Sequence, residues 1–429
     1  MVTHKQLADG VELNVLPSHQ FKTTRVVINF IAPLAAETIT QRSLLANLLE
    51  TNSQDYPTQA DLAAKLSAMY GADFGVTVGK QGNAHIFSMV LTVVNDRFLP
   101  GETHVLKDGL AFLKQILWRP NAAAGAFDAT TFKREKANLA AYLQSVYDSK
   151  QAYASLQLQA LYFQSSSAQR VPSFGNVKDL ADITAVSLFN YYQQLLAHDQ
   201  VMITVLGDVV PEQVVQEISQ FPFAARQSAA YPIFYQQSKL TSVLEKNDYQ
   251  VTNQAKLNLA YHAPVYFYQT DYYAMLLANA IFGASPLSLL FTNVRERASL
   301  AYYANSIYDG FRGLITVQTG IDASNYQRVK QIIAAQLAAL KKGEFSTDLL
   351  TQTKAMLRNQ YVSRLDSAGY LTHRALIEKL VPAAAVTNSA FTTALEAVTK
   401  AEVVAAAQKI NLQAVYFLSQ QRGEQVCKK

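Results

Sequence analysis

The stretch "VRERASLAYY" at residues 294–303 holds the side chains whose types and spacing best suit contact with a peptide. Arg295 is a cation that can donate hydrogen bonds to peptide carbonyl oxygens, and Tyr302 adds a hydroxyl seven residues later. The same two residues also fit an ordinary arrangement, with an arginine at a helix end and a tyrosine in a sheet core. Spacing alone leaves both interpretations open.

Other patterns that could carry chemistry are missing from the sequence. No two of the seven histidines lie within 14 residues of each other, so none form a metal-binding pair of short spacing. His85 and His262 lie in predicted strands, where packed or edge-strand histidines are the more common case. No Gly-Lys-Ser/Thr follows "VLGDV" at 205–209, and no serine sits in a nucleophile elbow. Cys427 is the only cysteine, which excludes an intramolecular disulfide framework and a cysteine-based zinc site.

Length and composition narrow the protein class. A chain of 429 residues predicts two domains of about 200 residues each. Half of the residues are hydrophobic and 16% are charged, which argues against disorder. The net charge of +5 comes from scattered Lys and Arg, whereas a nucleic-acid groove needs a dense basic stripe. Because the N-terminus lacks the apolar core of a signal peptide and no apolar run reaches 18 residues, we expect a soluble cytoplasmic protein that binds neither nucleic acid nor membrane.

The sequence repeats itself over long distances. "LLAN" occurs at 44–47 and again at 276–279, each time in a helical pattern after a β-rich run that ends on Ala-Pro. A later pair, "KANLAAYLQSVYDS" at 136–149 and "KAMLRNQYVSRLDS" at 354–367, shares Lys-Ala-x-Leu and Asp-Ser at identical spacing. Because these matches occur in the same order, they predict an internal duplication.

The repeated pattern also predicts the fold class. Each half runs strand, strand, helix, helix and then a hairpin-like region, at 71–94 and at 301–321, before two long helical stretches. Strands cluster around hairpin turns instead of alternating strictly with helices. This arrangement predicts an α+β protein with two homologous domains, each an antiparallel-rich sheet with helices packed on one face. We expect the domains at 1–221 and 246–429, joined by a linker at 222–245 that carries two prolines.

This layout resembles the M16 zinc peptidases, the family of pitrilysin and the mitochondrial processing peptidase. The likeness covers nearly the whole chain, and its most specific part is "VRERASLAYY". That stretch is close to the family pattern Arg-Glu-x-x-Gly-Leu-Ala-Tyr, with Ser299 in place of the usual glycine. The resemblance implies that each domain is one half of a clamshell. It also implies that Arg295 and Tyr302 match the pair that holds a substrate peptide near the zinc.

The zinc motif of active family members does not occur in this sequence. Those members carry His-x-x-Glu-His on the first helix, where two imidazoles on one face bind Zn²⁺ and the glutamate activates its water. By resemblance, the histidine positions fall on Ser43 and Asn47, the general-base position on Ala46 and a later ligand position on Tyr142. Ala46 cannot take a proton, and neutral oxygen groups are poor zinc ligands. We therefore expect no zinc and no other cofactor in this chain, and a helix at 43–50 that packs its four leucines into a core.

Three functions remain open at this point. The first is a non-catalytic, substrate-binding subunit of a heterodimeric M16-type peptidase, which supplies Arg295 and Tyr302 to a zinc-bearing paralogue. The second is a peptide-binding or assembly protein with no role in hydrolysis, and the third is an active peptidase with another metal geometry. We expect the first, with a peptide as the substrate and no hydrolysis by the isolated chain. A homodimer of the chain alone stays possible.

Overall fold

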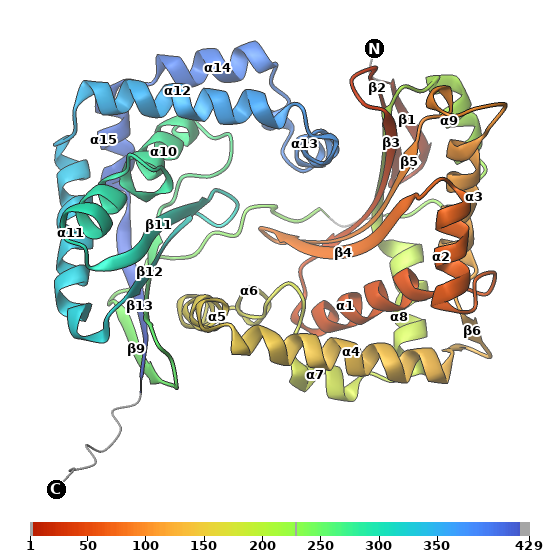
Figure 1. The fold of residues 1–429 in the computed structure, drawn as a ribbon, viewed down its shortest axis with the longest axis horizontal. Coiled ribbons are helices and arrows are strands. Elements are labelled where there is room, and N and C mark those ends of the chain that lie inside the picture. Colours follow the sequence, from red (N-terminus) through yellow and green to blue (C-terminus); the bar gives the residue numbers. More distant parts are fainter. Residues whose placement is uncertain (1–2, 228–229, 421–429) are drawn as a thin grey trace, which may run out of the picture. The chain divides into compact units, whose positions relative to one another are not determined.

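The computed structural model of the 429-residue chain describes residues 3–227 and 230–420 (Figure 1). These described residues form two compact units. The first unit contains the described residues up to Ser145, Val171–Pro232 and Arg364–Leu380. The second unit contains Val146–Arg170, Ile233–Ser363 and the described residues from Val381 onward. Each unit therefore takes segments from both halves of the sequence.

In the described part of the chain, the first unit is built on a six-stranded sheet with strand order β1-β2-β8-β3-β5-β4. Its strands are β1 (Thr3–Ala8), β2 (Val11–Pro17), β3 (Thr23–Pro33), β4 (Asp73–Gln81), β5 (Ala84–Val94) and β8 (Gln200–Gly207). β2 and β8 run parallel, and the other neighbouring strands run antiparallel. β4 and β5 are the hairpin predicted at 71–94.

The described residues of the second unit form a five-stranded sheet with strand order β11-β12-β10-β13-β9. Its strands are β9 (Leu244–Tyr249), β10 (Ala255–His262), β11 (Ala301–Asp309), β12 (Leu314–Ile321) and β13 (Asn411–Ser419). β13 and β9 run parallel, and the other neighbours run antiparallel. This order matches β4-β5-β3-β8-β2 of the first sheet, with the parallel pair at the same place. The predicted α+β class with two similar, antiparallel-rich sheets is confirmed.

The central strands of the first sheet are apolar on both faces. In β3, Val26, Ile28 and Phe30 alternate with Val27 and Ile31, and each is at most 6% exposed. Successive side chains of a strand point to opposite faces, so both faces of this sheet must be covered. On one face lie α1 (Ala36–Thr51) and α3 (Val105–Trp118), whose leucines share a core with β3. The sheet also contacts α13 (Ala368–Leu380), which lies against β8.

The remaining helices of the first unit complete this core. They are α2 (Gln59–Ala68), η1 (Asp96–Phe98), α4 (Ala129–Asp148), α7 (Val177–Asp182), α8 (Ala185–His198) and α9 (Pro211–Ile218), with the short strands β6 (Ala122–Ala123) and β7 (Ala126–Phe127). α8 begins with a capping box, in which Thr184 and Ser187 each accept from the other's backbone N–H. α2 is capped in the same way by Thr58 and Asp61.

Three helices cross between the halves of the sequence, and one of them is the short α6 (Ser167–Arg170), which belongs to the second unit. α5 (Lys150–Tyr162) follows the first long helical stretch, but its Ala154 and Leu158 are buried against Ala260 and Tyr416 of the second sheet. α13 comes from the second half and belongs to the first unit. The predicted domains, 1–221 and 246–429 with a linker at 222–245, are continuous segments of the chain, so they do not include this exchange of helices. These boundaries along the sequence remain a prediction.

The second unit carries most of its helices after β10. They are α10 (Tyr272–Asn279), η2 (Ala280–Ala284), η3 (Phe291–Arg297), η4 (Ala323–Asn325), α11 (Tyr326–Lys342), α12 (Thr347–Arg364), η5 (Pro382–Ala384), α14 (Asn388–Ala397) and α15 (Lys400–Gln408). η2 and η3 are π-helices, which occur frequently at functional sites. Among the described residues, no helix is long and apolar enough to cross a bilayer.

Candidate functional site

The helix at the position of the zinc motif is α1. Its four leucines, Leu44, Leu45, Leu48 and Leu49, are at most 3% exposed, which confirms the predicted core helix. Ser43 is 4% exposed and Ala46 is 3% exposed, so these two positions face the interior. The Ser43 hydroxyl donates to the carbonyl oxygen of Ile39 at 3.4 Å, within the same helix. Asn47 is half-buried.

The fourth position, Tyr142, lies on α4 and is 51% exposed. Its ring meets the ring of Phe174 edge-on, with centroids 5.7 Å apart. The four positions thus hold a hydroxyl, a methyl, an amide and a phenol, where a zinc centre requires imidazoles and a carboxylate. No group of three or more His, Cys, Asp or Glu side chains among the described residues could hold a metal ion. A zinc ion does not fit this donor set.

The loop at 171–176 ties this region to the β4–β5 hairpin. The Lys80 ammonium, on β4, donates to the carbonyl oxygen of Val171. His85 Nε2, on β5, lies 3.2 Å from the carbonyl oxygen of Ser173 and donates to it in the matching tautomer. The two contacts hold the loop against the hairpin.

The same loop is fastened to α1 through Thr40. The backbone N–H of Asn176 donates to Thr40 Oγ1 at 3.2 Å. Gly175 has φ +87°, and a Cβ added there would lie 2.4 Å from Thr40 Oγ1. Only glycine suits both the left-handed backbone and this close approach. Phe174, which contacts Tyr142, belongs to this loop, so the region around the degenerate motif is a packed structural junction.

A buried ion pair anchors α1 one residue before Ser43. Arg42 is completely buried, and its Nη1 lies 2.7 Å from Asp199 Oδ2 and 3.0 Å from the hydroxyl of Tyr191. Its Nη2 donates to the carbonyl oxygen of Phe30 at 2.8 Å. Burial raises the pKa of Asp199, although the guanidinium of Arg42 opposes that shift. We did not predict this pair, and its only sequence signal is that Arg42 is the one basic residue of α1.

The histidines of the two central strands are packed, as predicted. His85 is completely buried in β5. Burial lowers the pKa of His85 to about 3, and the nearby charges of Arg42 and Lys80 act in the same direction. His262, at the end of β10, is half-buried, and burial also lowers its pKa. Both side chains are therefore neutral at pH 7.

Arg295 and Tyr302 lie on the surface of the second unit. Arg295 is in η3 and is exposed, and its guanidinium lies 4.8 Å from the centroid of the Phe291 ring. It makes no ion pair with any described residue. Tyr302 is the second residue of β11 and is 72% exposed. Neither side chain belongs to a core, so the ordinary arrangement that the sequence left open, with the tyrosine in the sheet core, is wrong for Tyr302.

The turn between η3 and β11 contains Ser299, which stands where the family pattern has glycine. Ser299 has φ +54°, in the left-handed region that disfavours side chains with a Cβ. The N–H of Leu300 donates to the carbonyl oxygen of Val294 at 3.1 Å, which closes the turn. A glycine would adopt this conformation freely, so the serine stores local strain between Arg295 and Tyr302. η3 and β11 are in contact, and this turn sets how the two side chains are presented.

The chain is similar to known proteins over nearly its whole length. Residues 182–357 match the family model described as peptidase M16 inactive domain. The chain is 32% identical over 427 residues to the probable inactive metalloprotease YmfF of Bacillus subtilis strain 168, covering 96% of this chain and 97% of YmfF. A crystal structure of a conserved protein from Enterococcus faecalis V583 is 44% identical, with a TM-score of 0.94 and 99% of each chain covered. The peptidase M16 inactive domain from Pseudomonas fluorescens has the same fold, with a TM-score of 0.79 at 16% identity and 99% of each chain covered.

Proposed function

The chain belongs to the M16 peptidase family as an inactive member, and from this premise we propose that it is the substrate-binding, non-catalytic subunit of a two-chain metallopeptidase. The partner in this proposal is a paralogue with an intact His-x-x-Glu-His motif, which holds the zinc. This chain contributes Arg295 and Tyr302 to the substrate peptide.

The exposure of Arg295 and Tyr302 is the observation that carries this proposal. A tyrosine that is 72% exposed adds almost nothing to the core, and Arg295 makes no ion pair with a described residue. The turn that presents them holds Ser299 at φ +54°. Strained backbone of this kind is concentrated at sites with a function. Two unburied donors beside a strained turn therefore support a binding role over a structural one.

The chemistry of the pair suits a peptide backbone. The guanidinium of Arg295 offers several N–H donors to carbonyl oxygens, and the hydroxyl of Tyr302 offers another. A charge-assisted hydrogen bond contributes about 1.5 to 3 kcal/mol. The positions Ser43, Ala46, Asn47 and Tyr142 offer no group that could activate a water molecule, so in this proposal hydrolysis depends on the partner.

The shared strand order of the two sheets supports a second part of the proposal, namely that the two halves arose by duplication. β4-β5-β3-β8-β2 and β11-β12-β10-β13-β9 have the same order and the same single parallel pair. In such a protein each half can evolve separately. Loss of metal ligands in the first half is then compatible with retention of the Arg295 and Tyr302 pair in the second.

Reconstitution tests the proposal. Each subunit alone, and the mixture of this chain with the zinc-bearing paralogue from the same organism, would be assayed against a broad peptide library. We expect the mixture to associate and to cleave peptides, and this chain alone to be inactive. Chelator-sensitive cleavage by this chain alone would contradict the proposal. A mixture that binds peptides without cleaving them, or a homodimer that ignores the paralogue, would instead indicate a peptide-binding or assembly protein.

A matched pair of variants tests the site. Arg297 lies in the same π-helix as Arg295 and is also exposed, and its Nη1 donates to Asn293 Oδ1 at 3.2 Å. We expect Arg295→Ala to lower cleavage by the mixture about tenfold or more, the loss of one charge-assisted hydrogen bond. Arg297→Ala should change cleavage less than about twofold. Equal losses in both variants would mean that only the general charge of the surface matters.

A further inference from the structure

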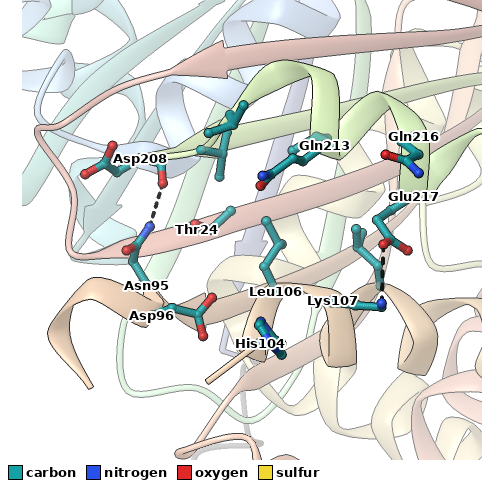
Figure 2. A pocket seen from close by; sticks show the side chains of 14 residues that line it. Thr24, Asn95, Asp96, His104, Leu106, Lys107, Asp208, Gln213, Gln216 and Glu217 are labelled. Carbon is teal, nitrogen blue, oxygen red and sulfur yellow. Dashed lines mark hydrogen bonds and ion pairs between the residues drawn. The ribbon is translucent and has the colours of Figure 1, made fainter. Parts of the chain in front are cut away.

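The cavity between α3 and α9 in the first unit measures about 420 Å³, and the carboxylates that line it already have partners (Figure 2). Glu217 lies 3.7 Å from the ammonium group of Lys107, and Asp208 pairs with Arg97. Asp96 accepts from the first backbone N–H of α3 at 2.8 Å. The lining residues therefore offer a ligand no unpaired carboxylate, and we assign this cavity no ligand.

In the second unit, Tyr302 is the extra residue of a β-bulge in β11. Ala301 pairs with Ile321 across the ladder between β11 and β12. Tyr303 pairs with Gly320, the next residue of β12, so Tyr302 has no residue opposite it. The matching edge strand of the first sheet, β4, pairs with β5 without a shift of register. Because bulges re-aim side chains and are common beside functional sites, this one determines how Tyr302 is presented.

Tyr303, which follows the bulge, is fixed at both its hydroxyl and its ring. The hydroxyl donates to Oε1 of Gln151, a residue of α5 that lies 152 positions away along the chain. The ring lies against Gly320, where an added Cβ would be 2.4 Å from Tyr303 Cε1. Burial raises the pKa of Tyr303 to about 12, so at pH 7 the hydroxyl keeps the proton that it donates.

Gln151 is itself held in one orientation. Its Nε2 donates to Oε1 of Gln318, on β12, at 3.1 Å. Gln318 in turn donates through Nε2 to Ser155 Oγ, on α5, at 3.2 Å. Each of the two amides uses both its donor and its acceptor, which makes the contact with Tyr303 directional. A helix from the first half of the sequence therefore holds the strand that carries Tyr302.

We propose that Gln151 is a positioning residue for Tyr302, and that it acts by holding Tyr303 and with it the bulge. This inference rests on the proposed function, in which Tyr302 contacts the substrate peptide. While Tyr303 is bonded to Gln151, it cannot slide along β12, and the bulge stays at residue 302. A slip of one residue would move the side chains of β11 to the opposite face of the sheet. The exchange of α5 between the halves thus gains a role in peptide binding.

Hydrogen exchange of the full chain, read by mass spectrometry, tests the support of the bulge. Tyr303→Phe removes the hydroxyl and keeps the ring, so we expect the amides of 301–304 to exchange about three- to tenfold faster, the loss of one hydrogen bond. The control is Tyr308→Phe, in the same strand, whose hydroxyl donates to the carbonyl oxygen of Val265 at 2.6 Å. It should leave the exchange at 301–304 unchanged. Unchanged exchange in Tyr303→Phe, or equal acceleration in both variants, would overturn the proposal.

Affinity for an unstructured chain tests the consequence at Tyr302. The probe is fluorescein-labelled, denatured casein, and its Kd is measured on the reconstituted pair after chelation of the zinc, so that the probe is bound but not cut. We expect Gln151→Met to weaken the Kd about three- to tenfold. Gln151→Glu, whose carboxylate still accepts from the hydroxyl of Tyr303, should stay within about twofold of the unmodified protein. In a Tyr302→Ala background, Gln151→Met should cause no further loss, because both changes act on the same contact.

The outcomes separate this inference from the proposed function. If Arg295→Ala weakens binding and Gln151→Met does not, the proposed function stands and the positioning role is wrong. If Gln151→Met weakens binding equally with and without the Tyr302 side chain, Gln151 acts elsewhere in the fold, and the inference is again wrong. If neither Arg295→Ala nor Tyr302→Ala changes the Kd, the proposed function fails and this inference falls with it.

Discussion

Arg42 Nη1 lies 2.7 Å from Asp199 Oδ2, and this pair joins the middle of α1 to the residue between α8 and β8 inside the first unit. Arg42 is completely buried and Asp199 is 8% exposed. The pair fixes α1 next to the positions at which active relatives would hold a metal. In this chain, that part of the helix is held by a charge network whose role is structural.

Breaking this pair from one side should destabilise the protein strongly. We expect Arg42→Met or Asp199→Asn to lower the free energy of unfolding by about 3 to 5 kcal/mol, because each leaves its partner buried without a counter-charge. The double variant Arg42→Met/Asp199→Leu should cost less than the sum of the two single changes. Urea unfolding measures all three. Single variants within about 1 kcal/mol of the unmodified protein would show that the pair is solvated.

Zinc should be absent from the purified chain. Ser43, Ala46, Asn47 and Tyr142 supply no imidazole, thiolate or carboxylate. Metal analysis of undialysed protein should therefore find far less than one zinc per chain. Near-stoichiometric zinc that disappears on changing Asn47 and Tyr142 would refute this expectation.

Relief of the strained turn should stabilise the second unit. We expect Ser299→Gly to raise the free energy of unfolding by about 0.5 to 1 kcal/mol, since glycine adopts positive φ without steric conflict. The neighbouring Ala298 has φ −85°, an ordinary right-handed value, so Ala298→Gly should instead destabilise by a similar amount. Thermal unfolding of both variants decides the matter. A loss of stability in Ser299→Gly would mean that the serine side chain holds the turn.

The two surface donors should matter little for folding. Arg295→Ala and Tyr302→Phe should each change the free energy of unfolding by less than about 0.5 kcal/mol, because exposed side chains contribute little to stability. In the reconstituted pair, Tyr302→Phe should lose less activity than Arg295→Ala, since it removes one neutral hydrogen bond and keeps the ring. Unfolding of Arg295→Ala, with normal function of the remaining folded fraction, would mark the pair as structural.

Acid should destabilise the first unit through His85. Burial lowers the pKa of His85 to about 3, whereas an unfolded histidine titrates near about 6.5. Between these values the unfolded chain binds a proton that the folded chain does not, so stability falls as the pH falls, by about 2 kcal/mol from this group at pH 5. Urea unfolding from pH 7 to pH 5 should show a smaller loss in His85→Gln, while the exposed control His104→Gln keeps the full loss. Equal pH dependence in all three proteins would exclude His85 as the cause.

Local patterns in the sequence predicted most elements of the fold correctly. The leucine-rich run at 43–50 lies inside α1, and the hairpins at 71–94 and 301–321 are β4–β5 and β11–β12. These predictions depend on the spacing of apolar residues within short segments, and this spacing can be read from the sequence alone. The exact ends were less accurate, since α1 begins at Ala36, in a polar turn that shows no apolar stripe.

Features that need distant segments could not be read from the sequence. The transfer of α5 and α13 between the halves depends on which sheet has an uncovered apolar face. The partner of Arg42 lies 157 residues away, and nothing near Asp199 marks it.

The sequence by itself determined which functional groups this protein has: no ligand set at the four positions of the zinc motif, and an arginine and a tyrosine seven residues apart in the second half. The functional group of a side chain depends only on the residue type, so it is known before the fold is known. Only the tertiary structure decided which of these groups reach solvent. Ser43 and Ala46 became interior and Arg295 and Tyr302 remained exposed, because burial is the sum of contacts with segments far along the chain.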